Sequence, residues 1–479
     1  MFAIKITAAI AGLTWGVVLL LNCSVLDGCF GLLLSSVFVS GQSLPFSLGP
    51  LPMTIDRLLV FVLVALYLIQ RFRGRSQPKP LRMCDYILFA FVAVVSISTF
   101  THDYMLTNGS YTAPIYRLVF SYWIPALVYW VARQSTLNNR NLTRFYYMMV
   151  ALGAYLAVTG LLEVAGQWSF VFPRYVSDPS LGIHFGRARG PMLNAVYLGM
   201  YLSVCMFVLG TLARRQSPPA VGMSLVLAFV FALAIYFTYT RSVWLGTLVG
   251  IGAVAYFALD LSMRPLMLFA TLLIVVILTF LKSDYLIAME REMSAEETRR
   301  SSVGRIITAY VSWQMFKERP LLGHGFGQYP IEKNRFLSNR DTPLPLEQIR
   351  TLVNHNSFLS LLTETGAVGL ALFMALIVSW VRSAIHILQS GPAWDWAHGH
   401  AVLMLACLGL YCIQLALHPL SYSQLPNLIV FLMAGITAGL QPMTDADRSN
   451  ITSFGEIARP RVVTHTDEHL DQREVAVTG

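Results

Sequence analysis

The chain has few charged residues for its length. Only 12% of its 479 residues are Asp, Glu, Lys or Arg, whereas 56% are hydrophobic. Soluble domains carry roughly 25% charged residues, so this composition excludes an ordinary soluble enzyme and indicates an integral membrane protein. The net charge of +9 comes from basic residues in short loops beside apolar runs, which is the positive-inside pattern of membrane proteins. No nucleic-acid partner is therefore expected.

The sequence also lacks any CxxC spacing. Its six cysteines lie in or beside apolar runs, where we expect small apolar side chains rather than zinc ligands or a disulfide framework. Three histidines in the C-terminal part, His398, His400 and His418, share no pattern with carboxylates or cysteines. The sequence therefore predicts neither a metal site nor a cofactor.

Apolar runs of about 20 residues are abundant, and each can cross the roughly 30 Å hydrocarbon core as a helix. The first forty residues are ambiguous, and we assign them one crossing followed by a re-entrant or interfacial piece from Asp27 to Gln42. The predicted fold is all-α, a polytopic helical bundle with about twelve transmembrane helices. The other eleven runs lie at residues 52–70, 83–101, 116–133, 144–164, 191–212, 219–239, 243–261, 265–283, 357–381, 398–417 and 423–440.

Basic residues set the orientation of these spans. Arg71, Arg73 and Arg75 mark one short loop as cytoplasmic, and the same bias returns at every second loop. Both termini are then cytoplasmic. Residues 1–440 form the membrane domain, and the polar residues 441–479 are predicted to be a disordered cytoplasmic tail. The predicted outward loops are residues 102–115, 165–190, 240–242, 284–356 and 418–422.

One outward loop is far larger than the others. Residues 284–356 carry 19 charged side chains between spans that have almost none, so this segment has to lie in water at the membrane face. Beginning at Arg305, the apolar residues Ile306, Tyr310 and Trp313 recur at helical spacing. This pattern predicts an amphipathic helix lying on the membrane or on the bundle.

His355 is the last ionisable residue before the next apolar run. An ordinary imidazole pKa of about 6.5 makes it a usable proton acceptor at neutral pH. The alternative is a histidine held by the backbone at a helix start, where Asn354 or Asn356 could cap the helix. His324 lies in a glycine-punctuated segment and is expected to be a turn residue. His355 is therefore the candidate catalytic residue.

Five arginines break the rule that short outward segments are poor in basic residues. Each one alone could reach lipid headgroups as a snorkelling side chain. Several that converge from separate loops would form a binding site, because a guanidinium grips phosphate oxygens with a planar pair of donors. We therefore expect these arginines to bind a lipid diphosphate. They are Arg117, Arg187, Arg189, Arg241 and Arg305.

Three segments, taken in their order and spacing, resemble the O-antigen ligase family and its relatives, the O-antigen polymerases and the protein O-oligosaccharyltransferases. The resemblance spans roughly residues 50–440. The segments are Thr240-Arg241-Ser242 after an apolar span, Arg305 opening the helix that leads to Glu318-Arg319-Pro320-Leu321-Leu322-Gly323-His324-Gly325-Phe326-Gly327, and His355-Asn356-Ser357-Phe358-Leu359 followed by Glu364-Thr365-Gly366.

The resemblance implies a bacterial inner-membrane enzyme whose active site faces the periplasm. Such an enzyme transfers a glycan from an undecaprenyl-diphosphate carrier to an acceptor hydroxyl, without a metal or cofactor. Its partners are the lipid-linked donor, a lipid A-core or other glycan acceptor, and membrane lipids. By resemblance, Arg241 and Arg305 hold the diphosphate, with Arg187 and Arg189 beside them, and His355 assists attack by the acceptor.

Ligation of O-antigen to lipid A-core is the favoured reaction, because of the segment that contains His355. Polymerisation of O-antigen or exopolysaccharide, and glycan transfer to protein, are alternatives within the same superfamily. A transporter of lipid-linked glycans is an alternative of another class. Transporters place charged residues near mid-span and show internal repeats, and the sequence shows few of the former and none of the latter.

Overall fold

The computed structural model describes residues 22–38, 43–48, 51–105, 112–213, 217–258, 264–265, 295–338, 342–390 and 396–441. All of them belong to one unit, Met1–Gln441. The second unit, Pro442–Gly479, lies outside the described residues, and with it nearly all of the predicted tail. Most of the predicted span at residues 265–283 lies outside them as well.

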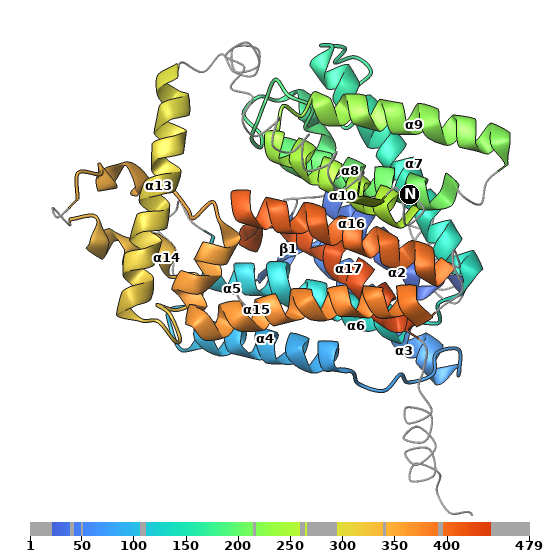
Figure 1. Cartoon of the computed structure of the whole chain (residues 1–479), viewed down its shortest axis with the longest axis horizontal. Helices are drawn as coiled ribbons and strands as arrows, with labels where there is room; N and C mark the ends of the chain where they lie inside the picture. Colours follow the sequence, from blue (N-terminus) through green and yellow to red (C-terminus); the bar gives the residue numbers. More distant parts are fainter. Residues whose placement is uncertain are drawn as a thin grey trace, which may run out of the picture. The chain divides into compact units, whose positions relative to one another are not determined.

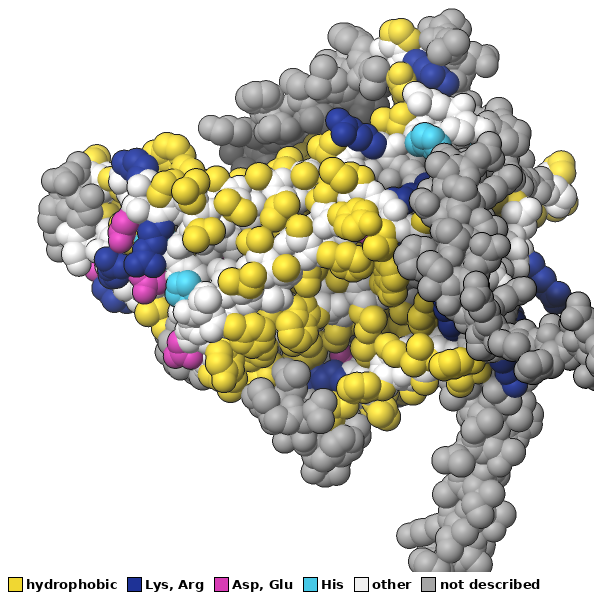
Figure 2. All heavy atoms as spheres, turned by 90° about the horizontal axis from the view of Figure 1, so that it is seen from below, with side chains coloured by type: hydrophobic (Ala, Val, Ile, Leu, Met, Phe, Trp, Pro, Cys, Tyr) yellow, Lys and Arg dark blue, Asp and Glu magenta, His cyan; other side chains and the backbone are white. Residues whose placement is uncertain are grey.

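The described chain is a bundle of α-helices, as the sequence predicts. Within the described residues, seven helices are long and apolar enough to cross a membrane. Figure 2 shows apolar side chains over the middle of one face and charged side chains towards its edges, which is the pattern of a surface in contact with lipid. The seven are α4 (Met83–Phe100), the continuous helix of α5 (Pro114–Leu118), a π-helical turn (Val119–Trp123) and α6 (Ile124–Gln134), then α7 (Asn139–Val164), α8 (Ala195–Ala213), α9 (Pro218–Tyr236), α15 (Ser357–Ser390) and α16 (Trp396–Leu417).

Three further helices correspond to predicted spans: α3 (Ile55–Phe72), α10 (Arg241–Ala258) and α17 (Gln424–Leu440). α17 is buried along almost its whole length. It contacts α6, α15 and α16, and lies among them in Figure 1. Helix α10 packs most extensively on α16. The apolar core of the bundle is therefore centred on α16 and α17, whose composition lets them be buried on all sides.

In the N-terminal part, Val25–Phe38 forms one helix, α2, with buried residues on several faces. Its 14 residues are too few for a full crossing, so the re-entrant or interfacial piece from Asp27 to Gln42 stays a prediction. Asp27 pairs with Arg144 near the start of α7, and the ring of Phe38 lies 5.5 Å from that of Tyr155 further along α7. α2 therefore runs beside α7, as a helix of 14 residues that extends about 21 Å.

A small antiparallel hairpin joins α2 to α3 and is a local exception to the all-α fold. Its strands are β1 (Ser43–Leu48) and β2 (Leu51–Thr54), and Leu48 pairs with Leu51 at the turn. The hairpin was not predicted, because its strands have only six and four residues and give no periodic signal of their own.

The loops meet in two groups, which we call the outer end and the inner end. The outer end contains the loops predicted to face outward. Here the ring of His418 is hydrogen-bonded to the hydroxyl of Ser242 at 2.7 Å, and Gln328 Nε2 donates to the carbonyl of Asp103 at 2.8 Å. The first contact joins the predicted outward loops 240–242 and 418–422, and the second joins loops 102–115 and 284–356. Arg117 connects the two pairs, because it contacts both Ser421 and Phe326.

The inner end contains the loops predicted to be cytoplasmic. Lys79 Nζ donates to the carbonyls of Ser135 at 2.9 Å and Gly439 at 3.0 Å. The hydroxyl of Ser76 donates to the carbonyl of Gln134 at 2.6 Å. The basic loop after α3, the loop after α6 and the end of α17 are thereby joined at this end of the bundle.

α15 is broken at Gly366, where the backbone leaves the helix with φ of 66°. The glycine-punctuated turn of the large loop enters this break. Gly325 N donates to the carbonyl of Glu364 at 3.0 Å, and Ala367 N donates to the carbonyl of Pro320 at 2.8 Å. Backbone groups released by the break are thus satisfied by the loop, as a low-dielectric setting requires. The large loop is anchored inside α15 rather than merely connected to it.

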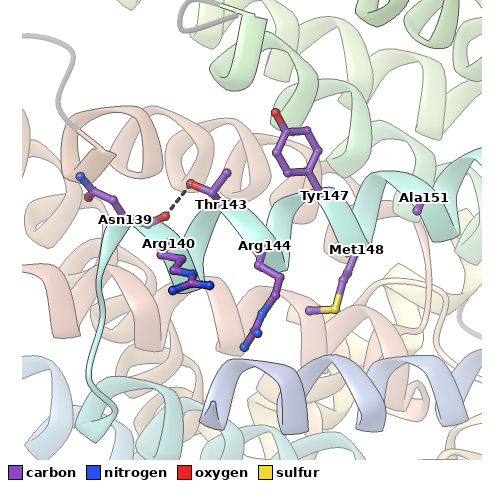
Figure 3. Close-up of a pocket in the computed structure, with 7 residues that line it drawn as sticks. All are labelled: Asn139, Arg140, Thr143, Arg144, Tyr147, Met148 and Ala151. Atoms are coloured by element: carbon purple, nitrogen blue, oxygen red, sulfur yellow. Dashed lines mark hydrogen bonds between the residues drawn. The ribbon is translucent and has the colours of Figure 1, made fainter. Parts of the chain in front are cut away.

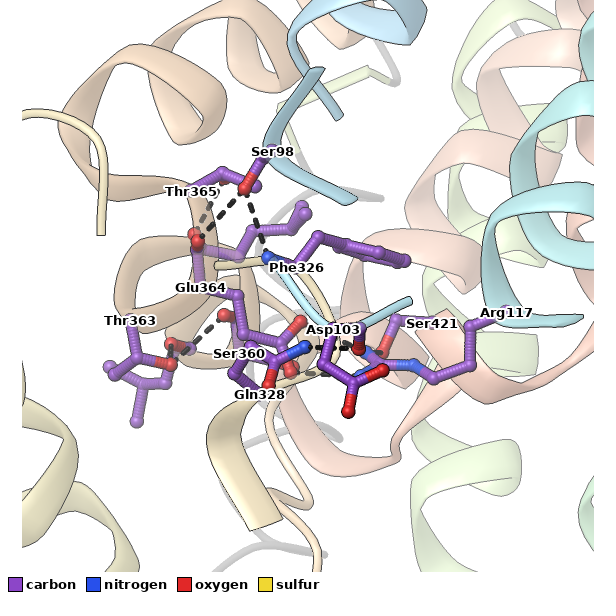
Figure 4. A network of polar contacts seen from close by, with 12 residues as sticks. Ser98, Asp103, Arg117, Phe326, Gln328, Ser360, Thr363, Glu364, Thr365 and Ser421 are labelled. Carbon is purple, nitrogen blue, oxygen red and sulfur yellow. Dashed lines mark hydrogen bonds and ion pairs between the residues drawn. The ribbon is translucent and has the colours of Figure 1, made fainter. Parts of the chain in front are cut away.

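A buried ion pair fixes the same junction. Arg117 on α5 donates to both carboxylate oxygens of Glu364, at 2.8 and 3.0 Å, and to the hydroxyl of Ser421 at 3.1 Å. Its guanidinium also lies over the rings of Phe326 and Tyr422, 4.6 and 3.7 Å from their centroids. Figure 4 shows Arg117, Glu364 and Ser421 in one polar network. One side chain thereby joins α5, α15, the large loop and the loop after α16.

The large loop has a small core of its own. Helix α13 (Ala295–Glu318) carries the predicted amphipathic segment, and its buried face is Ile307, Val311 and Met315. Of the predicted apolar residues, Tyr310 packs partly against this core, whereas Ile306 and Trp313 are 60% and 52% exposed. α13 therefore packs on the loop's own short helices, α14 (Tyr329–Glu332) and two 3-10 turns, and the contact of Ile306 and Trp313 with the membrane or the bundle stays a prediction.

We expect Glu364→Ala to destabilise the protein strongly. The change leaves a buried guanidinium without its counter-charge, which typically costs roughly 3–5 kcal/mol. Thermal unfolding in detergent, followed by tryptophan fluorescence, measures the effect. Arg335→Ala is the matched control, because Arg335 pairs with Glu332 and Glu318 on the exposed surface of the loop and surface pairs contribute little. Equal melting temperatures for the two variants would contradict the role assigned to the buried pair.

The topology is tested by cysteine labelling in a cysteine-free background. Asn334→Cys, in the large loop, should react with a membrane-impermeant maleimide added from outside the cytoplasmic membrane. Ser76 is buried, so its exposed neighbour in Gln77→Cys is the better inner-end probe, and it should react only after permeabilisation. Labelling of Asn334→Cys from the cytoplasmic side alone would reverse the orientation.

Candidate functional site

The candidate base, His355, lies on a turn between α13 and α15 that is held on both sides. Asn354 Nδ2 donates to the hydroxyl of Ser312 on α13 at 3.0 Å, and Asn354 Oδ1 accepts from Asn356 N at 3.0 Å. Asn356 Oδ1 in turn accepts from Leu359 N at 3.0 Å, which is a side-chain cap for the start of α15. The capping considered from the sequence is thus present, and it fixes the backbone on either side of His355.

The segment that leads to this turn is held by a buried lysine. Lys333 Nζ donates to the carbonyls of Ile349, at 2.7 Å, and Leu352. It also lies 5.5 Å from the centroid of the Tyr329 ring. Burial, and secondarily the charge of Arg350, lowers the pKa of Lys333 to about 8. The hydrogen bonds of Lys333 therefore hold the backbone of the segment that leads to His355.

His355 itself is half-buried. Its pKa lies below the usual value of 6.5, first because the ring is partly desolvated and second because Arg305 is positively charged. Arg305 is exposed on α13. A histidine with a lowered pKa is neutral at pH 7, so it can accept a proton. The structure thus places a neutral imidazole within the electrostatic influence of a predicted phosphate-binding arginine.

The start of α10 brings a second predicted arginine to the outer end. Tyr239 has a positive φ of 47°, and this tight turn lets the carbonyl of Thr240 accept from Val243 N at 3.0 Å. Arg241 is the first residue of the helix and is exposed. Arg187 reaches the same turn, because its Nη1 donates to the carbonyl of Tyr239 at 3.2 Å.

Two of the five arginines are in a different setting. Arg189 is fully buried. Its Nε donates to Glu163 at 2.9 Å, and its Nη2 donates to the carbonyls of Val176 and Asp178 at 2.9 and 3.0 Å. Like Arg117, it has a carboxylate partner and closes a loop. These contacts favour a structural role for both arginines over the predicted contact with a diphosphate.

His418 is a group that the sequence analysis considered only as a metal ligand. It lies in the short loop after α16 and hydrogen-bonds to Ser242. Burial lowers its pKa to about 4, and the charges of Arg305, His355 and His184 contribute further. These residues therefore share one electrostatic environment. The sequence feature that could have identified His418 is its position, because it is the first residue of one of the five loops predicted to face outward.

The outer end thus combines exposed guanidinium groups with histidines that are neutral at pH 7. Arg241 and Arg305 are exposed and Arg187 is half-buried, so the local charge is positive. Such an arrangement can hold an anion with several charged oxygens and can accept a proton beside it. Among the described residues, no group of three or more His, Cys, Asp or Glu side chains could hold a metal ion.

A groove lies away from this end. An open groove of about 630 Å³ runs along the first turns of α7 and is lined by residues including Arg140, Arg144 and Tyr147 (Figure 3). Arg144 pairs with Asp27 at the start of α2. The groove is near the inner end and shares no residue with the histidines and arginines described above.

Fold and site together define a polytopic α-helical membrane protein with a basic, histidine-containing site at one end of its bundle. Residues 223–374 match the family model described as O-antigen ligase. The chain therefore carries an O-antigen ligase domain, consistent with the superfamily of O-antigen ligases and polymerases. The match runs from α9 into α15 and includes Arg241, Arg305 and His355, whereas Arg117 and His418 lie outside it. No curated protein matches the chain.

Proposed function

We propose that this protein is a metal-independent glycosyltransferase of the bacterial inner membrane. It transfers a glycan from an undecaprenyl-diphosphate carrier to a sugar hydroxyl of the acceptor, and the reaction is O-antigen ligation to lipid A-core. The active site faces the periplasm, residues 1–440 form the transferase domain, and residues 441–479 are a cytoplasmic tail. The O-antigen ligase match at residues 223–374 supports the reaction class.

The observation that carries the proposal is the arrangement at the outer end. Burial first, and then the charge of Arg305, lowers the pKa of both His355 and His418. The hydrogen bond between His418 and Ser242 brings the start of α10, and with it Arg241, to the same end of the bundle. Exposed guanidinium groups and a neutral imidazole are what a lipid-diphosphate donor and a hydroxyl acceptor need. Arg187, which bonds to the turn before Arg241, is a further candidate for the donor site.

On the donor side, a lipid diphosphate is a good leaving group, and the protein has to stabilise the charge that develops on its oxygens. Arg241 and Arg305 would do so with paired N–H donors. Exposed apolar side chains of α9, including Met223, Leu225 and Phe229, belong to the surface over which a polyprenyl chain can reach this end. The lipid tail then stays in the membrane while the diphosphate enters the basic site.

On the acceptor side, a sugar hydroxyl is a poor nucleophile and needs a positioned base. His355 takes the hydroxyl proton as the acceptor oxygen forms its bond to the anomeric carbon of the donor. The bond from that carbon to the phosphate oxygen breaks, and the electron pair leaves with undecaprenyl diphosphate. The imidazolium then returns its proton to water.

The arginine prediction concerns geometry rather than charge. Arg241→Lys and Arg305→Lys keep a positive charge but lose the planar fork, so each should slow glycan transfer roughly 10- to 100-fold. The measurement is transfer by purified protein from an undecaprenyl-diphosphate glycan to lipid A-core. Arg335→Lys, on the exposed surface of the same loop, should retain full activity. Wild-type rates in both test variants would favour headgroup snorkelling instead.

The base prediction is that His355→Ala loses about 10²- to 10⁴-fold in transfer rate, while expression and binding of the donor are retained. His386→Ala, on the exposed part of α15, is the matched control.

Because the charge of Arg305 lowers the pKa of His355, Arg305→Gln should raise that pKa and move the acid limb of kcat/KM to higher pH. Near wild-type turnover of His355→Ala would remove the base assignment, and loss of wild-type activity in chelator would remove the metal-independent mechanism.

A further inference from the structure

The last turn of α16 holds the residue next to Arg241 in two ways. Gln414 Nε2 donates to the backbone carbonyl of Ser242 at 2.7 Å. One turn later, His418 Nε2 lies 2.7 Å from the hydroxyl of the same serine. Both the backbone and the side chain of Ser242 are therefore fixed by α16, and Ser242 lies in the first turn of α10 directly after Arg241.

His418 also contacts the start of α15. The hydroxyl of Ser357 donates to the carbonyl of His418 at 2.8 Å and accepts from Leu420 N at 2.9 Å. Ser357 is the first residue of α15 and follows His355 by two positions. His418 thus connects the helix that begins with Arg241 to the helix that begins just after His355.

The packing beneath this connection is close enough to make it rigid. A Cβ atom at Gly246 on α10 would lie 3.3 Å from the backbone Cα of Leu410 on α16, and 2.5 Å from the Cδ1 atom of the same leucine. α10 and α16 therefore approach each other at their backbones. The hydrogen bond between His418 and Ser242 lies at the end of this packed pair, where α10 begins at the exposed Arg241.

We propose that His418 is a positioning residue, which uses its hydrogen bond to Ser242 to set the direction of Arg241 relative to His355. The inference rests on the proposed function, because it takes Arg241 as a contact of the donor diphosphate. A paired grip on phosphate oxygens depends on the angle of the guanidinium plane as well as its charge. An arginine at an exposed helix start needs a fixed first turn to keep that angle.

The test is binding of undecaprenyl diphosphate, the carrier without its glycan, to the purified full-length protein in nanodiscs. His418→Ala and Ser242→Ala should each weaken binding about 10-fold, since each removes the same part-buried hydrogen bond. The double variant should be no weaker than either single one. His418→Gln should stay within about threefold of wild type, because an amide can replace the imidazole in this bond.

In the transfer assay, the same variants should raise the KM for the lipid-linked donor with little change in kcat, because His355 is intact. His398→Ala, at the other end of α16, is the control and should bind as wild type does. Ser242→Ala leaves the bond from Gln414 to the backbone in place, so it decides the matter if His418→Ala fails to fold. Melting temperatures are measured for every variant.

The outcomes separate this inference from the proposed function. If Arg241→Lys weakens carrier binding but His418→Ala and Ser242→Ala do not, the positioning role is overturned and the donor site stands. Failure of His418→Gln to restore binding in a protein that melts like wild type also overturns it. If Arg241→Lys binds the carrier as tightly as wild type, both the donor site and the positioning role fall.

Discussion

A charged side chain that is buried near a membrane needs a counter-charge within the protein. The packing of the outer end depends on one such buried ion pair. The guanidinium of Arg117 is buried against the carboxylate of Glu364. Because it also contacts Ser421 and Phe326, it fixes the loop after α16 and the glycine turn of the large loop to α15. The pair lies where α15 is broken at Gly366, so electrostatics and backbone hydrogen bonding hold the same junction together.

The same constraint divides the five predicted phosphate-binding arginines into buried and exposed ones. Arg117 and Arg189 have carboxylate partners and are buried, whereas Arg241 and Arg305 are exposed on helices at the outer end. Glu364 lies 247 residues from Arg117, so nothing local in the sequence reveals the pairing. Burial with a carboxylate makes an arginine part of the scaffold, whereas Arg241 and Arg305 are exposed at the outer end, where an anion can reach them. The candidate donor site is accordingly smaller than the sequence alone suggests.

The spans were predictable because the bilayer imposes a length and a composition on each helix. α4 was expected at residues 83–101 and is Met83–Phe100, and α16 was expected at residues 398–417 and is Trp396–Leu417. The re-entrant piece at α2 stays a prediction, because apolar composition does not distinguish a re-entrant helix from a short helix buried in the bundle. The break at Gly366 was missed, since it depends on backbone groups supplied by Pro320 and Gly325, which no hydropathy pattern records.

For the site, sequence reasoning identified residues but not their connections. Arg241, Arg305 and His355 stand out as polar groups at the edges of apolar runs, which is a local property. The role of His418 is not a local property, because it depends on Ser242 and Ser357, which come from distant parts of the sequence and contact His418 at the end of α16. Hydrogen bonds between helix ends are set by the packing of the whole bundle, and a single sequence carries little trace of them.

The division of the site between bundle and loop has a consequence for how it can act. Arg241 begins a bundle helix, whereas Arg305 lies on α13 of the large loop and His355 lies where that loop returns to α15. A loop that moved freely would change the distance between the two phosphate-binding candidates. It is held instead by the glycine turn in the break of α15, by the bond from Asn354 to Ser312 and by the buried Lys333. The anchors are buried, so the site is arranged before any substrate arrives. Residues on the exposed surface of the loop, such as Arg335 and Arg350, take no part in these anchors, so they can change without disturbing the candidate arginines or His355.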